Sequence, residues 1–597
     1  MRLHLQQAAD ARRYNLPTVE EIAAVVPGDG LENVRAHRDI ILRLQGGGLR
    51  RISNLHPSYL PLHYVLFFPH GEEGWHLDIP LQLPNGNAPH HSKKVTQLLW
   101  YAYRLHIRPS EIEPQDLFKG GRLFQQFTCD GWASCNLTWA ANNQKKLRAD
   151  LYQGLQDRMR RDGDEGQNLG QVGHVILPST HKGGPRYMQQ LLQDSLAICR
   201  EFRKPDLFLT MTANGSWPEI SQNLLPGMYI NTDMLTKLNV FCHLGQTTVD
   251  RPDLVARVFH AKQQTLLKKI RDGYFGEVAG FVYTIEYQKR GLPHMHLLIF
   301  LEQQDKISTV QQIDAIISAQ IPDSQIHPQL HAAVSKYMLH GPCSPQRCLE
   351  NNVCKKRFPK AFMNQTIIKE DGYPDYARSD NGRTVQKHQD VFDNKVVVPH
   401  PRELLVQFNC HINLEVCAFI KAVKYIHKYI YKGPDCATVL TEGENEICTY
   451  LDARYISSTQ ACHNIFEFPM HMEWPAVYRL AVHLPGRQSV VFQAEDEIEN
   501  VLNNVKDTQL LGWFKANQDP DLIEAGAHNH LYQDFPKKFV WNKSRAVWTV
   551  RQRYKAIGRM YSVPVSAGEA FYLRLLLTVV KGKTNHHCVL IKFISPH

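Results

Sequence analysis

The pattern of apolar and polar positions predicts three β-strands in the middle of this chain. Phe281–Tyr287 and His294–Leu301 are apolar runs of strand length, joined by a polar turn that carries Gly291 and Pro293. Leu207–Thr212 is a third run of the same kind. The short connection between the first two runs predicts a hairpin, and therefore an antiparallel arrangement.

Apolar residues at helical spacing surround these strands. The pattern predicts helices over Asn142–Arg161, Met188–Phe202, Arg251–Ile270 and Asn413–Gly433, and the last of these begins with Asn413 as its N-cap. Strands that alternate with helices indicate an α+β fold, with a central antiparallel sheet flanked by helices and with additional N- and C-terminal regions.

The predicted hairpin carries a candidate metal site. His294 and His296 are two residues apart on a strand, so their side chains share one face. If the hairpin folds about Arg290, Glu286 lies opposite His294 within cross-strand contact distance. Two imidazoles and a carboxylate make a three-ligand site for a divalent cation, with open positions for a substrate oxygen. Gln288 is an alternative oxygen ligand, and ordinary strand histidines beside a solvated carboxylate are the alternative reading.

The predicted helix over Asn413–Gly433 carries a second set of reactive groups. Tyr425 and Tyr429 are neighbours one turn apart, whereas Tyr431 points away and suits packing. Nearby cations help a phenol, whose pKa is ordinarily about 10, to form the nucleophilic phenolate. Four lysines on the same arc could hold a phosphodiester backbone: Lys421, Lys424, Lys428 and Lys432. An amphipathic surface helix with two exposed tyrosines remains the alternative.

A cysteine-rich segment between the hairpin and this helix suggests a structural zinc site. His340, Cys343, Cys348 and Cys354 can complete a tetrahedral set of ligands, and turns at neighbouring Gly and Pro residues bend the chain. The basic run Lys355–Lys360 follows directly and could touch DNA phosphates or form a solvated face. Unliganded loop cysteines are the alternative to zinc.

Composition permits several classes of function. Among 597 residues, 68 Lys and Arg exceed 58 Asp and Glu, which gives a net charge of +10 and a mild basic bias compatible with nucleic acid. The first residues lack the apolar core of a secretory signal, and no segment has the length of a membrane span. The 13 cysteines are therefore expected to be thiols or metal ligands in a nuclear or cytosolic protein.

Three segments together resemble the Rep nuclease of Helitron rolling-circle transposons, a two-tyrosine member of the HUH endonucleases. They are the strand Leu207–Thr212, the His294–His296 motif and the Tyr425–Tyr429 motif. The resemblance spans about Tyr14–Lys581. It includes further blocks at Phe124–Phe127, Asn142–Arg148, Leu225–Gly227, Lys289–His294 and His411–Asn413.

The resemblance implies an HUH core that cleaves single-stranded DNA and transfers strands through a covalent 5′-phosphotyrosine. Glu286, His294 and His296 would hold Mg²⁺ or Mn²⁺, and Tyr425 or Tyr429 would attack the phosphate. Single-stranded DNA at transposon ends and targets would be the partner, with no membrane involved, and the protein would act in the nucleus. His411 and Glu415 are left open, since capping and packing explain them equally well.

The same resemblance divides the chain. Residues 1–135, a mixture of short apolar runs with Gly and Pro turns, form an irregular N-terminal region, and 136–435 form the nuclease domain with an inserted Cys/His segment at about 335–362. Residues 436–580 are a mixed region that leads towards a helicase in related proteins, and 581–597 are an atypical tail.

The helicase itself is expected to be absent. Gly582–Thr584 is a Gly-Lys-Thr triplet, but Leu577 stands where a phosphate-binding loop needs glycine. Truncation or an altered reading frame is the plain interpretation, and another chain could supply the helicase. The competing interpretations are a catalytically silent DNA-binding remnant of a transposon and an accessory protein that binds a helicase.

Overall fold

A computed structural model describes most of the chain. It covers residues 2–4, 23–27, 40–45, 47–82, 94–108, 116–153, 155–156, 185–226, 245–288, 291–344, 348–370, 372–387, 389–417, 436–441, 449–493, 495–586 and 589. The chain forms two compact units. The first comprises Met1–Thr138, Asp206–Val278 and Tyr283–His471, and the second comprises Trp139–Pro205, Ala279–Val282 and Met472–His597.

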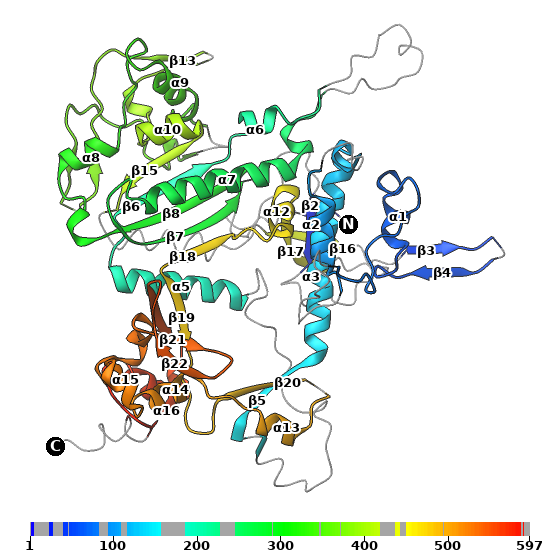
Figure 1. Cartoon of the computed structure of the whole chain (residues 1–597). Helices are drawn as coiled ribbons and strands as arrows, with labels where there is room; N and C mark the ends of the chain where they lie inside the picture. The colour runs from blue at the N-terminus through cyan, green and yellow to red at the C-terminus, as the bar shows by residue number, and fades with distance from the viewer. Residues whose placement is uncertain are drawn as a thin grey trace. The chain divides into compact units, whose positions relative to one another are not determined.

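A five-stranded sheet is the centre of the mixed α and β structure (Figure 1). Its order is β15 (Ile412–Val416), β6 (Leu207–Thr212), β8 (Pro293–Leu301), β7 (Val278–Tyr287) and β18 (His471–Trp474). Strand β6 pairs antiparallel with both β15 and β8. A five-residue connection joins β7 to β8, so these two strands form the predicted hairpin. The three strands expected from the apolar runs are confirmed.

Side chains alternate between the two faces of the sheet along each strand, and one of these faces is apolar. The apolar face is completely buried and includes Leu209, Met211, Met295, Leu297, Ile299, Ile412 and Leu414. Helix α7 (Pro252–Arg271) lies along the sheet in Figure 1. Its own buried side chains include Phe259, Leu266 and Ile270. The opposite face, called the polar face below, carries His294 and His296 near the start of β8 and the buried Leu298 and Phe300 farther along the same strand.

The helices expected over Met188–Phe202 and Arg251–Ile270 are confirmed as α5 (Pro185–Phe202) and α7. The prediction of a helix that begins at Asn413 is wrong for its first residues, because Asn413 lies within β15. Buried residues recur there at every second position, and the pairing with β6 outweighs the capping signal.

Two further expectations are corrected. The helix expected over Asn142–Arg161 is wrong across β5 (Leu147–Leu151), which pairs antiparallel with β20 (Ser489–Gln493). Such long-range pairing cannot be seen in local spacing. Residues 1–135 are not wholly irregular, since they contain α2 (Gln97–Arg104) and most of α3 (Arg122–Lys146).

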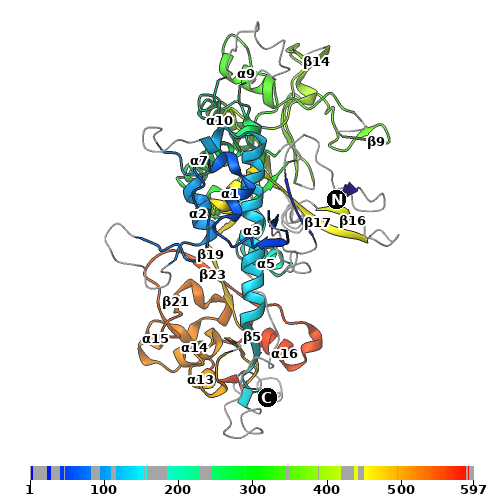
Figure 2. The same cartoon turned by 90° about the vertical axis from the view of Figure 1, so that its right-hand side faces the viewer.

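The first unit contains a second sheet in the order β1-β16-β17-β2, which joins the N-terminal strands to residues beyond 435. Figure 2 shows β16 and β17 side by side. The bounds are β1 (Arg2–His4), β2 (Ala23–Pro27), β16 (Cys436–Thr441) and β17 (Thr449–Ser457). Its remaining elements are β3 (Ile40–Arg43), β4 (Leu49–Ile52), α1 (Tyr59–His63), α6 (Pro218–Ser221), α8 (Val310–Ile316), α9 (Pro328–Tyr337), β9 (Leu349–Glu350), β10 (Val353–Cys354), β11 (Ile367–Ile368), β12 (Pro374–Asp375), β13 (Val385–Lys387), β14 (Asp390–Phe392), α10 (Arg402–Phe408) and α12 (Ser458–Ile465).

The second unit packs around an aromatic core and a buried ion cluster. Its further elements are β19 (Ala476–Leu480), α13 (Ile498–Asn503), α14 (Gln509–Ala516), α15 (Pro520–Glu524), β21 (Phe539–Asn542), β22 (Val547–Val550), β23 (Ala556–Met560) and α16 (Glu569–Leu576). The fully buried Asp194 accepts from Arg479 Nη2 and from Arg559 Nε, each at 2.5 Å. Because these charges are buried and paired, removing one partner would leave an uncompensated charge inside this unit. Within the described residues, no helix is both long and apolar enough to cross a membrane.

Candidate metal centres

Glu286, His294 and His296 come together on the polar face of the sheet. One ligand atom from each lies within 4.8 Å of the others. The hairpin sets this geometry, because Gln288 N–H donates to Leu292 O at 3.0 Å. Moving two residues away from the turn on each strand, from Gln288 to Glu286 and from Leu292 to His294, places Glu286 opposite His294. The sequence prediction for these three side chains agrees with the observed geometry.

Neighbouring side chains fix the two imidazoles. Thr212 Oγ1 is hydrogen-bonded to His294 Nδ1 at 2.8 Å, which leaves Nε2 as the ring nitrogen for a metal. His296 Nε2 lies 3.1 Å from Glu286 Oε1. The ring of Phe208 stacks on His296, with centroids 5.9 Å apart and planes 8° apart. Such outer contacts set the orientation that metal ligands need.

The electrostatics of the group favour a neutral imidazole at position 294. Burial lowers the pKa of His294 to about 3, with further contributions from His296, His411 and Lys356 that outweigh the opposing Glu286. A neutral ring keeps the lone pair that binds a cation. Two imidazoles and a carboxylate suit a borderline or hard divalent ion, and three protein ligands leave positions for water or substrate. The donor set therefore fits a catalytic metal. Gln288 is exposed just beyond β7 and stays an alternative oxygen ligand.

Strand β15 adds a row of polar groups to the same face. Thr212 N–H donates to His411 O at 3.0 Å, and Asn413 pairs with Thr210, so both side chains share the face of His294 and His296. Asn413 Nδ2 donates to Glu415 Oε1 at 3.1 Å. Among the described residues, Asn413 Oδ1 and His411 Nδ1 are buried without a hydrogen-bond partner.

Sequence reasoning left His411 and Glu415 open and missed Asn413, because it treated this stretch as the start of a helix. The apolar alternation at Ile412, Leu414 and Val416 was the signal that could have found the row.

The two candidate nucleophiles cannot be placed. Tyr425 and Tyr429 lie outside the described residues, as do the four lysines proposed to hold DNA: Lys421, Lys424, Lys428 and Lys432. The last described residue before them is Cys417, whose N–H donates to Asp206 O at 2.8 Å. The segment with the tyrosines therefore follows directly in sequence from β15, the strand beside β6.

His340, Cys343, Cys348 and Cys354 form a second group, whose ligand atoms also lie within 4.8 Å of one another. His340 Nε2 is 3.4 Å from Cys343 Sγ and 3.3 Å from Cys354 Sγ. One nitrogen and three sulfurs make the closed tetrahedral set of a structural zinc site. The four residues predicted from their spacing are therefore brought together in a group that could hold a metal ion.

The loop favours the thiolate form at Cys354 but not at Cys343. Burial raises the pKa of Cys354, but the backbone N–H groups of Phe358 and Lys356, together with the thiols of Cys343 and Cys348, outweigh burial and lower it. Burial and the neighbouring cysteine thiols raise the pKa of Cys343 to about 12. The backbone also closes around the sulfurs, since Lys355 N–H donates to Cys348 O at 2.8 Å. The ring of Phe358 stacks on His340 with centroids 4.4 Å apart.

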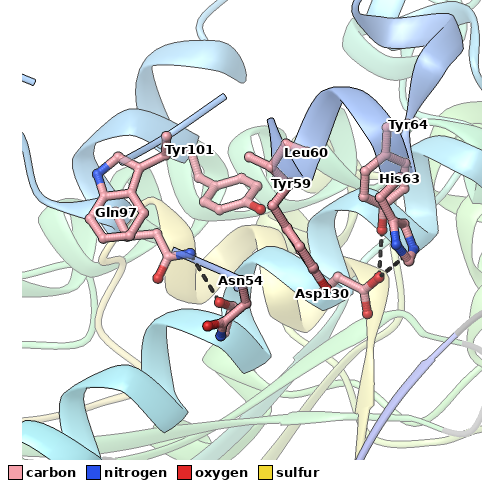
Figure 3. Close-up of a pocket in the computed structure, with 10 residues that line it drawn as sticks. Asn54, Tyr59, Leu60, His63, Tyr64, Gln97, Tyr101 and Asp130 are labelled. Carbon is pink, nitrogen blue, oxygen red and sulfur yellow. Dashed lines mark hydrogen bonds and ion pairs between the residues drawn. The ribbon is translucent and has the colours of Figure 1, made fainter. Parts of the chain in front are cut away.

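A third polar cluster lines a small pocket in the first unit (Figure 3). Tyr64 donates to Asp130 Oδ2 at 2.5 Å, and His63 Nε2 lies 3.9 Å from the same oxygen. Burial and Asp130 raise the pKa of Tyr64 far above the usual value, so this phenol stays protonated. The cavity measures about 20 Å³, which is room for one water molecule and not for a nucleotide. It does not compete with the metal groups as a reaction site.

The comparisons with known proteins agree with this location. Residues 100–299 match the family model described as the Helitron helicase-like domain at the N-terminus. The matched region contains β6, β7 and most of β8, and with them Glu286, His294 and His296. No curated protein matches the chain. Over residues 100–299, the chain is similar to the N-terminal helicase-like domain of Helitrons.

Proposed function

We propose that this chain is a metal-dependent endonuclease and strand transferase that acts on single-stranded DNA in Helitron-type rolling-circle transposition. The observation that carries the proposal is the group Glu286, His294 and His296, which projects from the polar face of a rigid sheet inside the Helitron-like region. Three ligands with open positions suit a cation that binds a phosphate oxygen. Such a protein would act on nuclear DNA.

In the proposed reaction, each residue has a distinct task. Thr212 holds His294 in the orientation that directs Nε2 to the cation, and Glu286 supplies the anionic oxygen. When bound, Mg²⁺ or Mn²⁺ would polarise the scissile phosphate. The phenolic oxygen of Tyr425 or Tyr429 would form a bond to phosphorus while the bond from phosphorus to the 3′ oxygen breaks. The departing 3′ oxygen gains a proton, and the 5′ end stays joined to the tyrosine.

Two other interpretations remain as outcomes of the test. A catalytically silent remnant would bind single-stranded DNA without cleaving it. An accessory protein would bind a helicase from another chain. Neither accounts for the neutral, oriented imidazole of His294 beside an anionic ligand, because DNA binding alone requires cations on the protein surface.

A cleavage assay separates these candidates. The purified chain would be treated with EDTA and incubated with an end-labelled single strand, with and without added Mg²⁺ or Mn²⁺. Cleavage that requires the added ion, with a free 3′-hydroxyl on one product and protein on the other, is the expected result. Binding without cleavage at any metal concentration would support the silent remnant and reject the proposed function.

A further inference from the structure

Strands β3 and β4 of the first unit form a small sheet of their own. They pair antiparallel from Ile40 opposite Ile52 towards the turn, and they extend beyond α1 in Figure 1. Gly47 and Gly48 turn the chain with positive φ angles of 83° and 96°, and Gly47 N–H donates to Leu44 O at 3.1 Å. The result is a two-stranded ribbon, a structure that is only marginally stable in water by itself.

The two faces of this ribbon differ in burial, because side chains alternate along each strand. One face holds Ile40, Leu42, Arg50 and Ile52. On this face Ile52 is buried, Ile40 and Leu42 are half-buried, and Arg50 is exposed. The protein therefore covers part of this face.

The other face is exposed throughout, and we call it the exposed ribbon face. It consists of Ile41, Arg43, Leu49 and Arg51. Ile41 is 66% exposed and Leu49 is 72% exposed. Ile41 lies opposite Arg51, and Arg43 lies opposite Leu49. Each strand thus contributes one arginine and one aliphatic side chain, so the two arginines lie diagonally at opposite edges of the ribbon.

The charge of the ribbon determines which partner suits this face. The described residues 40–45 and 47–52 contain three arginines and no aspartate or glutamate. A second copy of the chain, packed face to face, would bring arginine against arginine, because a two-fold contact pairs the same surface with itself. A polyanion neutralises the arginines, and DNA is the polyanion on which the proposed function depends.

The shape of the ribbon favours double-stranded DNA. The major groove of B-DNA admits a two-stranded β-ribbon. With the exposed ribbon face towards the bases, Ile41 and Leu49 meet base edges, where thymine methyl groups offer apolar contacts. Arg43 and Arg51, at opposite edges, then extend towards the phosphates on the two sides of the groove. A single strand has no such groove.

We propose that the β3–β4 ribbon binds the major groove of double-stranded DNA through Ile41, Arg43, Leu49 and Arg51. The inference rests on the proposed function in one respect, because the duplex would adjoin the single strand that is cut. It adds a second kind of DNA partner and a surface separate from the metal group in sequence. The ribbon would hold the chain at a junction between paired and unpaired DNA.

Binding of a fluorescent duplex of random sequence, without added Mg²⁺ or Mn²⁺, tests the arginines. Arg43→Gln should bind about tenfold more weakly than the wild-type chain, because a charged hydrogen bond is lost. The slope of log K against log salt should fall by about 0.9, the value of one phosphate contact on B-DNA. The variant with both Arg43→Gln and Arg51→Gln should show about twice this change in slope.

Arg50→Gln is the matched control, because it removes the same charge from the other face of the same strand pair. Its affinity for the duplex should stay within about twofold of the wild-type value, since only long-range attraction changes. The affinity of Arg43→Gln for a single strand of equal length should also change less than its affinity for the duplex. Equal losses for Arg43→Gln and Arg50→Gln, or for duplex and single strand, would overturn the inference.

Thymine methyl groups test the position of the aliphatic side chains. The wild-type chain should bind a random duplex that contains thymine about fourfold more tightly, for each methyl group contacted, than one that contains uracil. Ile41→Ser and Leu49→Ser should reduce this preference. Equal affinity of the wild-type chain for both duplexes would overturn the inference. So would a change in the sedimentation of the chain without DNA in Leu49→Ser, because the exposed ribbon face would then bind a second copy.

Failure of the proposed function gives a different result. A wild-type chain that binds the duplex as expected but never cleaves a single strand retains the ribbon inference and rejects the endonuclease. A wild-type chain that cleaves single strands but binds the duplex no better than Arg43→Gln retains the endonuclease and rejects the ribbon inference.

Discussion

The two metal-ligand groups of the first unit differ in the structures that hold them. Glu286, His294 and His296 stand on paired strands whose opposite face is the buried core. The Cys/His group lies in a loop with only the two-residue strands β9 and β10, and its ends are tied down by backbone hydrogen bonds. Packing of the paired strands against the core orients the sheet group, whereas backbone hydrogen bonds and two short strands hold the loop group.

The number and type of ligands separate the groups further. Three ligands of mixed nitrogen and oxygen leave coordination positions for a substrate, whereas one imidazole and three thiols close a tetrahedron. The comparison shows that the first unit brings together two ligand groups whose chemistry suits different purposes. The sheet group suits exchangeable Mg²⁺ or Mn²⁺ and chemistry, and the loop group suits resident Zn²⁺ and architecture.

The largest expected effect comes from breaking the loop group. Cys354→Ser should lower the zinc content from about one ion per chain to none, because it removes one of the four proposed ligands. The loop should also become less stable, because the free energy of binding structural zinc contributes to folding. Metal analysis after dialysis measures this, and limited proteolysis should then cut within the loop. Cys199→Ser, at a half-buried thiol in α5, should keep its zinc. Active, freshly purified wild-type protein without zinc would rule the loop site out.

Breaking the sheet group should remove activity and leave the fold. His294→Ala and His296→Ala should each lower the cleavage rate about 10²–10³-fold, because the stabilisation of transition-state charge by a bound metal is worth several kcal/mol. Circular dichroism and zinc content should match the wild-type chain. His327→Ala, at an exposed histidine, serves as control. Cleavage by the double variant at the wild-type rate would contradict the metal assignment.

A smaller effect concerns how the stability of the fold depends on pH through the buried His400. Burial lowers its pKa to about 4, below the 6.5 of an exposed imidazole. The unfolded chain therefore takes up the proton first, so stability is complete above pH 6.5 and is lost as the pH falls towards 4. His400→Leu should reduce this loss by up to about 1.4 kcal/mol per pH unit, measured by urea unfolding. An unchanged pH dependence would show that His400 is not protonated on unfolding.

The group on the sheet could be predicted from the sequence, because the positions of its three side chains follow from local rules. Alternation on one strand and a short hairpin suffice to bring Glu286, His294 and His296 together. The Cys/His group also followed from ligand spacing. The row on β15 did not, because Asn413 carries a helix-capping signal and its strand pairing depends on β6, about 200 residues earlier in the chain.

The central claim is that the sheet group holds a phosphate for attack by a tyrosine, and mass spectrometry of the DNA-linked peptide tests it most directly. After incubation with a single strand and Mn²⁺, the account predicts a 5′-phosphate adduct on Tyr425 or Tyr429, absent after EDTA or in His296→Ala. Tyr425→Phe or Tyr429→Phe alone should retain some cleavage with impaired joining, the double variant should form no adduct, and Tyr431→Phe should behave as the wild-type chain. An adduct on Tyr431, or an adduct that forms equally in EDTA, would contradict it.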